Sequence, residues 1–106
     1  MTNVESKSGE LTGIVSNTVG QSVWVKNPVG YIVGQTKEGE WTVLTEFPCT
    51  NDVIRISGAG CNFEDAFQKY KNKLVFTCLA LLNQPVSNLT TEGVEAKGIL
   101  EHYFAI

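Results

Sequence analysis

Positive charge is scarce in this chain. Eight Lys and Arg face eleven Asp and Glu among 106 residues, and the net charge is −3. Nucleic-acid-binding domains gather Lys and Arg on one face to neutralise phosphates, so this balance argues against a nucleic-acid partner. Lys69, Lys71 and Lys73 alternate along a predicted helix and point in different directions, which favours solvation over phosphate binding.

Long apolar runs are also missing. The most apolar stretch, 74–82, is interrupted by Thr77, whereas a helix needs roughly 20 apolar residues to cross a bilayer. The first ten residues lack the basic start and apolar run of a secretory signal. We therefore expect no membrane segment and a cytoplasmic location.

Cysteine and histidine are too few for a metal site or a disulfide framework. Cys49, Cys61 and Cys78 are odd in number and lack a Cys-x-x-Cys spacing, and His102 is the one histidine. A structural zinc site needs four closely spaced ligands. The sequence predicts three reduced thiols, no metal and no cofactor.

Signatures of catalysis are absent as well. The sequence has no carboxylate pair of defined spacing and no nucleophile elbow, so we expect no enzymatic activity. Residues 58–60 contain two glycines before a predicted helix but match neither a dinucleotide fingerprint nor a P-loop. A third-ranked alternative is a small enzyme that uses Cys61, with a thiolate stabilised by the helix dipole and His102 as its base.

The residues that are present indicate one globular domain. Apolar residues make up 42% of the chain and charged residues 18%, which is typical of a folded protein. A length of 106 residues leaves no room for a second core. We predict a flexible N-terminus at 1–10 and a single domain at 11–106.

Apolar alternation and turn residues predict short strands in the first half of the chain. Residues 16–20 form the turn of a first hairpin, and 37–39 form the turn of a second. Asn27–Gly30 contains a proline and is expected to interrupt the pattern. The predicted strands are Leu11–Val15, Ser22–Val25, Tyr31–Gln35, Glu40–Phe47 and Val53–Ser57.

The hydrophobic period changes after Gly60 and predicts one long helix from Asn62 to Asn83. Asn62 is a suitable N-cap, and Pro85 follows the expected end. Alternation at 93–106 predicts a final strand, bent at Gly98. The predicted fold class is α+β, with an antiparallel sheet of five to six strands and one long helix packed on one face.

Aromatic and glycine residues supply the candidate binding site. Trp24 and Trp41 lie on predicted strands, where an aromatic side chain can stack on a ligand or anchor a partner, although core packing is the ordinary alternative. The candidate residues for a partner or ligand are Trp24, Trp41, Arg55, Gly58 and Gly60.

The second half of the predicted helix is apolar on most of its circumference. One sheet covers a stripe of about 100°, so the remaining face is expected to pack against a second copy of the chain in a two-fold dimer. The candidate interface residues are Phe76, Leu79, Leu82 and Tyr103. The alternative is a monomer in which the N-terminal hairpin covers that face.

Residues 38–48, Ser57-Gly58 and 62–66 carry a resemblance to a known family. The glycine-aromatic hairpin, the proline after its second strand and the acidic helix opening are similar to HicB-like antitoxins over residues 31–75. The resemblance implies a partly RNase-H-like β-β-β-α-β domain that binds a small toxin ribonuclease through its surface. The chain differs from that family in its additional N-terminal hairpin.

These observations favour a non-catalytic binding or inhibitory module that acts on a protein partner, either antitoxin-like or of the phage anti-defence type. The alternative is a protein that sequesters a small nucleotide-like ligand, with Trp41, Arg55 and Gly58 as its contacts.

Overall fold

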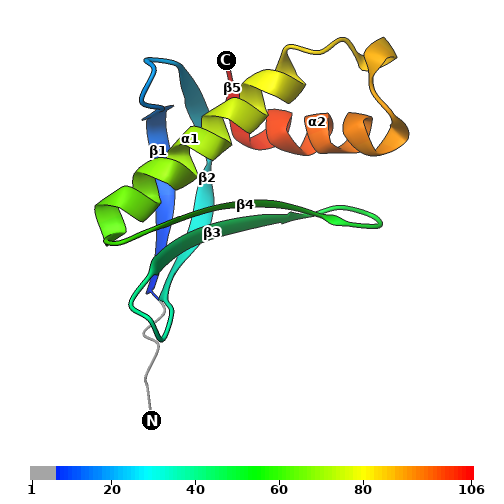
Figure 1. The fold of residues 1–106 in the computed structure, drawn as a ribbon. Coiled ribbons are helices and arrows are strands. Elements are labelled where there is room, and N and C mark those ends of the chain that lie inside the picture. Colours follow the sequence, from blue (N-terminus) through cyan, green and yellow to red (C-terminus); the bar gives the residue numbers. More distant parts are fainter. Residues whose placement is uncertain (1–6) are drawn as a thin grey trace.

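Four long strands form an antiparallel sheet in the order β1-β2-β3-β4 in the computed structural model, which describes residues 7–106 (Figure 1). A fifth strand, β5, pairs with the beginning of β2. The five strands are β1 (Lys7–Ser16), β2 (Ser22–Gln35), β3 (Trp41–Pro48), β4 (Val53–Gly60) and β5 (Phe104–Ala105). The α+β class and the antiparallel sheet of five strands are therefore confirmed. Of the predicted flexible N-terminus, residues 7–10 belong to β1, and residues 1–6 lie outside the described residues.

Strand β2 is continuous, and the predicted interruption at Asn27–Gly30 is wrong. Its pairing with β1 changes register instead: Leu11 lies opposite Val29, but Gly13 lies opposite Val25. Residues 26–28 of β2 therefore lie opposite the single residue 12 of β1, and they form a bulge that contains Pro28. A bulge tolerates proline, which has no N–H, because a bulged residue need not donate a hydrogen bond to the neighbouring strand.

The β3–β4 hairpin leaves the rest of the sheet at its far end. Strand β3 pairs with β2 from Trp41 to Leu44, while its pairing with β4 runs on to Pro48. We call residues 45–56 the β3–β4 arm, which extends past β2 in Figure 1. Strand β4 also continues to Gly60, three residues beyond the predicted end at Ser57.

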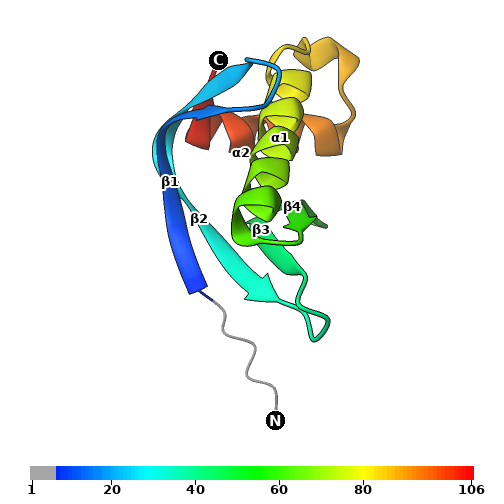
Figure 2. The same ribbon diagram turned by 60° about the vertical axis from the view of Figure 1, so that its left-hand side comes forward.

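Helix α1 (Phe63–Leu82) confirms the predicted long helix. The Asn62 side chain accepts a hydrogen bond from the Asp65 amide at 2.8 Å, and Asn83 is the C-cap. Asn62 therefore satisfies one of the free amides that begin every helix. Figure 2 shows α1 against one side of the sheet, which we call the inner face. The opposite side is the outer face.

A second helix, α2 (Thr91–Tyr103), replaces most of the strand that we predicted at 93–106. Thr90 caps it by accepting from the Gly93 amide at 3.1 Å, and the 3-10 turn Val86–Asn88 precedes it. Only Phe104–Ala105 form a strand in this region. The prediction of a single helix is therefore wrong.

The core lies between the inner face, α1 and the end of α2. Tyr70, Leu74 and Cys78 of α1 are fully buried, and Leu100 and Phe104 join them from the C-terminal segment. The strands contribute Leu11, Val15, Val23, Val29, Val33, Val43, Phe47 and Ile56. Among the described residues, no helix is long and apolar enough to cross a membrane.

Candidate interaction surface

The outer face carries large apolar side chains that no described element covers. Ile14 is 57% exposed, Trp24 58% and Ile32 55%. Exposed residues alternate with buried or half-buried ones along β2 from Ser22 to Val33, so the even-numbered residues of this stretch belong to the outer face. Ile14 lies directly opposite Trp24 in the β1–β2 register, and Ile32 lies opposite Leu44 on β3. The outer face therefore presents two apolar cross-strand pairs.

A depression, which we call the outer hollow, lies beside the Ile32–Leu44 pair. Its volume is about 490 Å³, and it is lined by residues that include Ser8, Glu10, Gly30, Ile32, Leu44 and Glu46. Two features create it. Gly30 has no side chain to fill the surface, and β3 diverges from β2 beyond the Ile32–Leu44 pair.

A buried threonine, Thr45, lies at the point where β3 separates from β2. The Thr45 hydroxyl donates to the Gly30 carbonyl at 2.9 Å and also contacts the Tyr70 hydroxyl at 2.5 Å. These bonds connect β2, β3 and α1 at one point. The floor of the outer hollow is therefore held by a hydrogen-bonded part of the core, which makes it a preformed surface.

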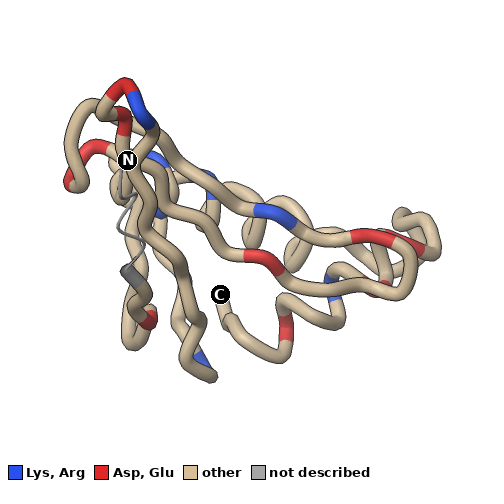
Figure 3. Tube along the Cα trace, turned by 90° about the horizontal axis from the view of Figure 1, so that it is seen from below, with Lys and Arg blue, Asp and Glu red and all other residues tan. Residues whose placement is uncertain are grey.

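Most charges on the outer face are already engaged. Arg55 Nη2 lies 3.1 Å from Glu46 Oε2, and Lys26 Nζ donates to the Glu101 carbonyl at 2.7 Å. Glu10 has no ion-pair partner within the part of the chain that the structure describes. Figure 3 shows Lys and Arg interspersed with Asp and Glu along the chain, without a separate basic region.

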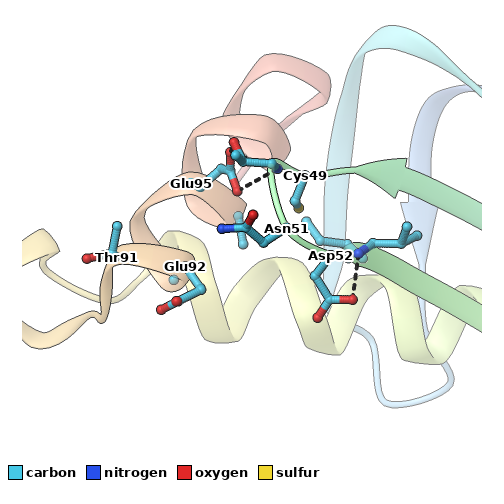
Figure 4. A pocket seen from close by; sticks show the side chains of 11 residues that line it. Cys49, Asn51, Asp52, Thr91, Glu92 and Glu95 are labelled. Carbon is cyan, nitrogen blue, oxygen red and sulfur yellow. Dashed lines mark hydrogen bonds between the residues drawn. The ribbon is translucent and has the colours of Figure 1, made fainter.

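A second cavity of about 410 Å³ lies between the tip of the β3–β4 arm and the first turns of α2 (Figure 4). The Glu95 carboxylate accepts from the Thr50 amide at 3.1 Å and from the Thr50 hydroxyl. Asp52 accepts from the Val53 amide at 2.7 Å. Both carboxylates accept hydrogen bonds from backbone amides of the arm. We therefore interpret this cavity as part of the contact between the arm and α2. We had predicted a strand at 93–106 and thus did not anticipate it.

The three cysteines do not form a reactive pair with histidine. Cys61 is exposed just before α1, whereas His102 lies in the last turn of α2, where its ring packs edge-on against Tyr103 at 4.9 Å. Cys78 is buried in the core, and burial raises its pKa to about 12, which favours the unreactive thiol. Cys49 is half-buried and its sulfur donates to the Phe47 carbonyl.

The candidate partner- or ligand-binding residues fall on both faces of the sheet. Trp24 and Arg55 are exposed on the outer face. Trp41 is half-buried on the inner side, with its ring 6.3 Å from that of Phe63. Gly58 and Gly60 are buried under α1, where a Cβ on either would collide with the helix. Trp41, Arg55 and Gly58, the proposed contacts of a small ligand, are thus not brought together.

The candidate interface residues also separate. Phe76 of α1 is 70% exposed. Leu79, Leu82 and Tyr103 are partly buried and pack against the core, and the Tyr103 ring lies 5.0 Å from Phe47. The β1–β2 turn approaches α1 through hydrogen bonds between Thr18 and Asn72, but it leaves Phe76 uncovered.

The sequence analysis missed Ile14, Ile32, Glu10 and Gly30 as surface residues. Even-numbered alternation from Ser22 to Gln35 would have placed Ile32 and Gly30 on the face of Trp24, had that segment been treated as one strand. Within residues 7–106, no group of His, Cys, Asp and Glu side chains is arranged to hold a metal ion.

Comparison with known proteins finds no match to this chain among family models, curated proteins or solved structures. The similarity of residues 31–75 to HicB-like antitoxins therefore stays a prediction.

Proposed function

We propose that the chain is a non-catalytic protein-binding module, antitoxin-like or of the anti-defence inhibitor type, which docks its partner on the outer face. The cross-strand pair of Ile14 and Trp24 carries this proposal, because both side chains are more than half exposed. Tryptophan on a rigid sheet is a typical binding hot spot, since it buries a large area at little entropic cost.

The surroundings of Trp24 support this assignment. Ala105 of β5 lies opposite it on the other side of β2, so Trp24 stands in the middle of three paired strands. Its backbone is therefore fixed on both sides. A partner that covered the pair would bury apolar surface without first ordering a loop.

Substitution of Trp24 tests the proposal. A tagged chain is used to isolate stoichiometric partners from its host, the partner is purified, and its affinity is measured by calorimetry. Trp24→Ser should weaken binding by about 2 kcal/mol or more, the loss expected for a hot spot. Val86→Ser is the matched control, because Val86 is also exposed but lies before α2. Equal affinity of wild type and Trp24→Ser for the purified partner would refute the proposal.

We also infer that the chain forms a two-fold dimer through α1. A cytoplasmic location is a separate part of the proposal. The exposed Phe76 supports the dimer, and Val19 of the β1–β2 turn is exposed as well. Sedimentation should give twice the 11.6 kDa of one chain. Phe76→Glu should give one chain with an unchanged circular dichroism spectrum, since this side chain supports little of the core. A wild-type mass of one chain would exclude the dimer.

A further inference from the structure

The outer hollow combines an apolar floor with a carboxylate, Glu10, that has no cationic partner among the described side chains. Ile32 is exposed, Leu44 is half-buried, and Gly30 leaves the surface open between them and β1. Glu10 and Glu46 line the same hollow from β1 and β3. Because Glu46 already pairs with Arg55, Glu10 is the carboxylate that remains for a ligand among the described residues.

We propose that the outer hollow receives an arginine or lysine side chain of the protein partner, an inference that rests on the proposed function. The aliphatic stem would lie on Ile32 and Leu44, and the cationic head would reach Glu10. Long basic side chains bury their methylene groups against apolar surface while the charged end stays at a wet rim. The hollow offers both environments within one volume of about 490 Å³.

Charge complementarity selects this occupant over a purely apolar one. A leucine or phenylalanine over the floor would remove water from Glu10 without giving it a partner, which is unfavourable for a carboxylate. A cation can form an ion pair with the Glu10 carboxylate, and the net charge of −3 on the chain favours the approach of positively charged groups. Arginine fits best, because its planar guanidinium can bind a carboxylate through two N–H groups.

Gly30 provides a way to fill the hollow without disturbing the fold. A Cβ at this position meets no atom within 4 Å, and Gly30 is not among the glycines with positive φ. The backbone of Gly30 therefore accepts a side chain, which would extend from the outer face. Gly30→Leu should fold normally and occupy the space that we assign to the partner's side chain.

The test uses a peptide pair that differs in one charge. Isotope-labelled full-length chain is titrated with acetyl-Leu-Arg-Leu-amide and with the same peptide carrying neutral citrulline, while the amide resonances of Glu10, Gly30 and Ile32 are followed. The arginine peptide should cause saturable shifts at these amides and bind about five-fold more tightly than the citrulline peptide. Glu10→Gln should remove that difference, and Gly30→Leu should abolish the shifts.

Glu38→Gln is the matched control, because Glu38 is an exposed carboxylate in the β2–β3 turn, away from the hollow. It should leave both titrations unchanged. Equal binding of the two peptides, shifts located elsewhere, or no saturation by about 10 mM would overturn the inference. A purified partner that needs Trp24 but binds Glu10→Gln as tightly as wild type would overturn it too, while the proposed function would stand.

Discussion

The hydroxyl groups of Thr45 and Tyr70 lie 2.5 Å apart in the core, where they join β3 to α1. Thr45 has one hydroxyl proton and donates it to the Gly30 carbonyl at 2.9 Å. Tyr70 is therefore the donor to Thr45, and its pKa is raised to about 12 by burial, which keeps that proton in place. This chain of hydrogen bonds runs from α1 through the sheet to the floor of the outer hollow.

Thr45→Val should destabilise the protein although it conserves the shape of the side chain. The valine removes the hydrogen bonds that the Thr45 hydroxyl makes with the buried Tyr70 hydroxyl and the Gly30 carbonyl. An unsatisfied buried polar group costs about 1–3 kcal/mol. Urea unfolding measures the loss. Thr12→Val, on the exposed side of β1, should change the free energy of unfolding by less than about 0.5 kcal/mol. If both variants were equally stable, the buried hydrogen bonds would contribute nothing.

Stability should fall in alkali because two buried groups resist ionisation. Burial raises the pKa of Tyr70 from 10.0 and that of Cys78 from 9.0, each to about 12. The folded chain thus keeps protons that the unfolded chain releases, and the free energy of unfolding declines as pH rises from 9 toward 12. Each group contributes about 1.4 kcal/mol per pH unit within its own window.

Urea unfolding at neutral pH and at about pH 11 tests this dependence. Tyr70→Phe and Cys78→Ala should each reduce the alkaline loss, since each removes one group that ionises only in the unfolded chain. Cys61→Ala, at an exposed cysteine, should retain the wild-type loss. A wild-type stability independent of pH over this range would contradict the assignment.

Two glycine-to-alanine substitutions should have opposite effects. A Cβ on Gly58 would lie 2.8 Å from the Tyr70 Cα and closer still to the Ala66 carbonyl, so the helix must shift. Overpacking of this kind typically costs about 1–3 kcal/mol. Gly98 lies within α2 with open space around it, and alanine there should stabilise the chain by about 0.5–1 kcal/mol. Thermal unfolding of the two variants should therefore shift in opposite directions; a stable Gly58→Ala would contradict the close approach.

Local signals made α1 and β3 predictable from the sequence. Asn62 caps the helix, and the buried residues Val43, Thr45 and Phe47 alternate with half-buried or exposed neighbours, as expected for a strand with one buried side. The C-terminal segment was ambiguous, because Ala96, Leu100 and Phe104 fit both a spacing of two and the i, i+4 spacing of a helix. The Thr90 side chain, which accepts from the Gly93 amide, is the N-cap signal that favours a helix in this segment.

The interaction surface depended on long-range geometry that no local pattern contains. Alternation showed that Trp24 and Val23 lie on opposite faces, but only the packing of α1 determines which face is covered. The outer hollow requires β3 to leave β2 after Leu44, where the β3–β4 arm begins. Gly58 looked like a ligand-binding residue because its role in the close approach of α1 is a tertiary one.

The contact between Glu95 and Thr50 should control the mobility of the β3–β4 arm. Glu95 accepts from the Thr50 amide, so Glu95→Ala should increase hydrogen exchange at that amide by about ten-fold, the equivalent of one charge-assisted hydrogen bond. Phe47 still packs against Phe104, with ring centres 6.3 Å apart, and should keep the base of the arm folded.

Glu92→Ala is the control for this exchange measurement. Glu92 lines the same cavity, but its carboxylate makes no hydrogen bond to the described residues, so its loss should leave exchange at Thr50 unchanged. Equal exchange rates in wild type and Glu95→Ala would show that the arm is held by its apolar base alone. Faster exchange in Glu95→Ala, confined to the tip of the β3–β4 arm, would show instead that the Glu95 carboxylate holds this tip in place. The tip needs such a contact because β2 does not pair with β3 beyond Leu44.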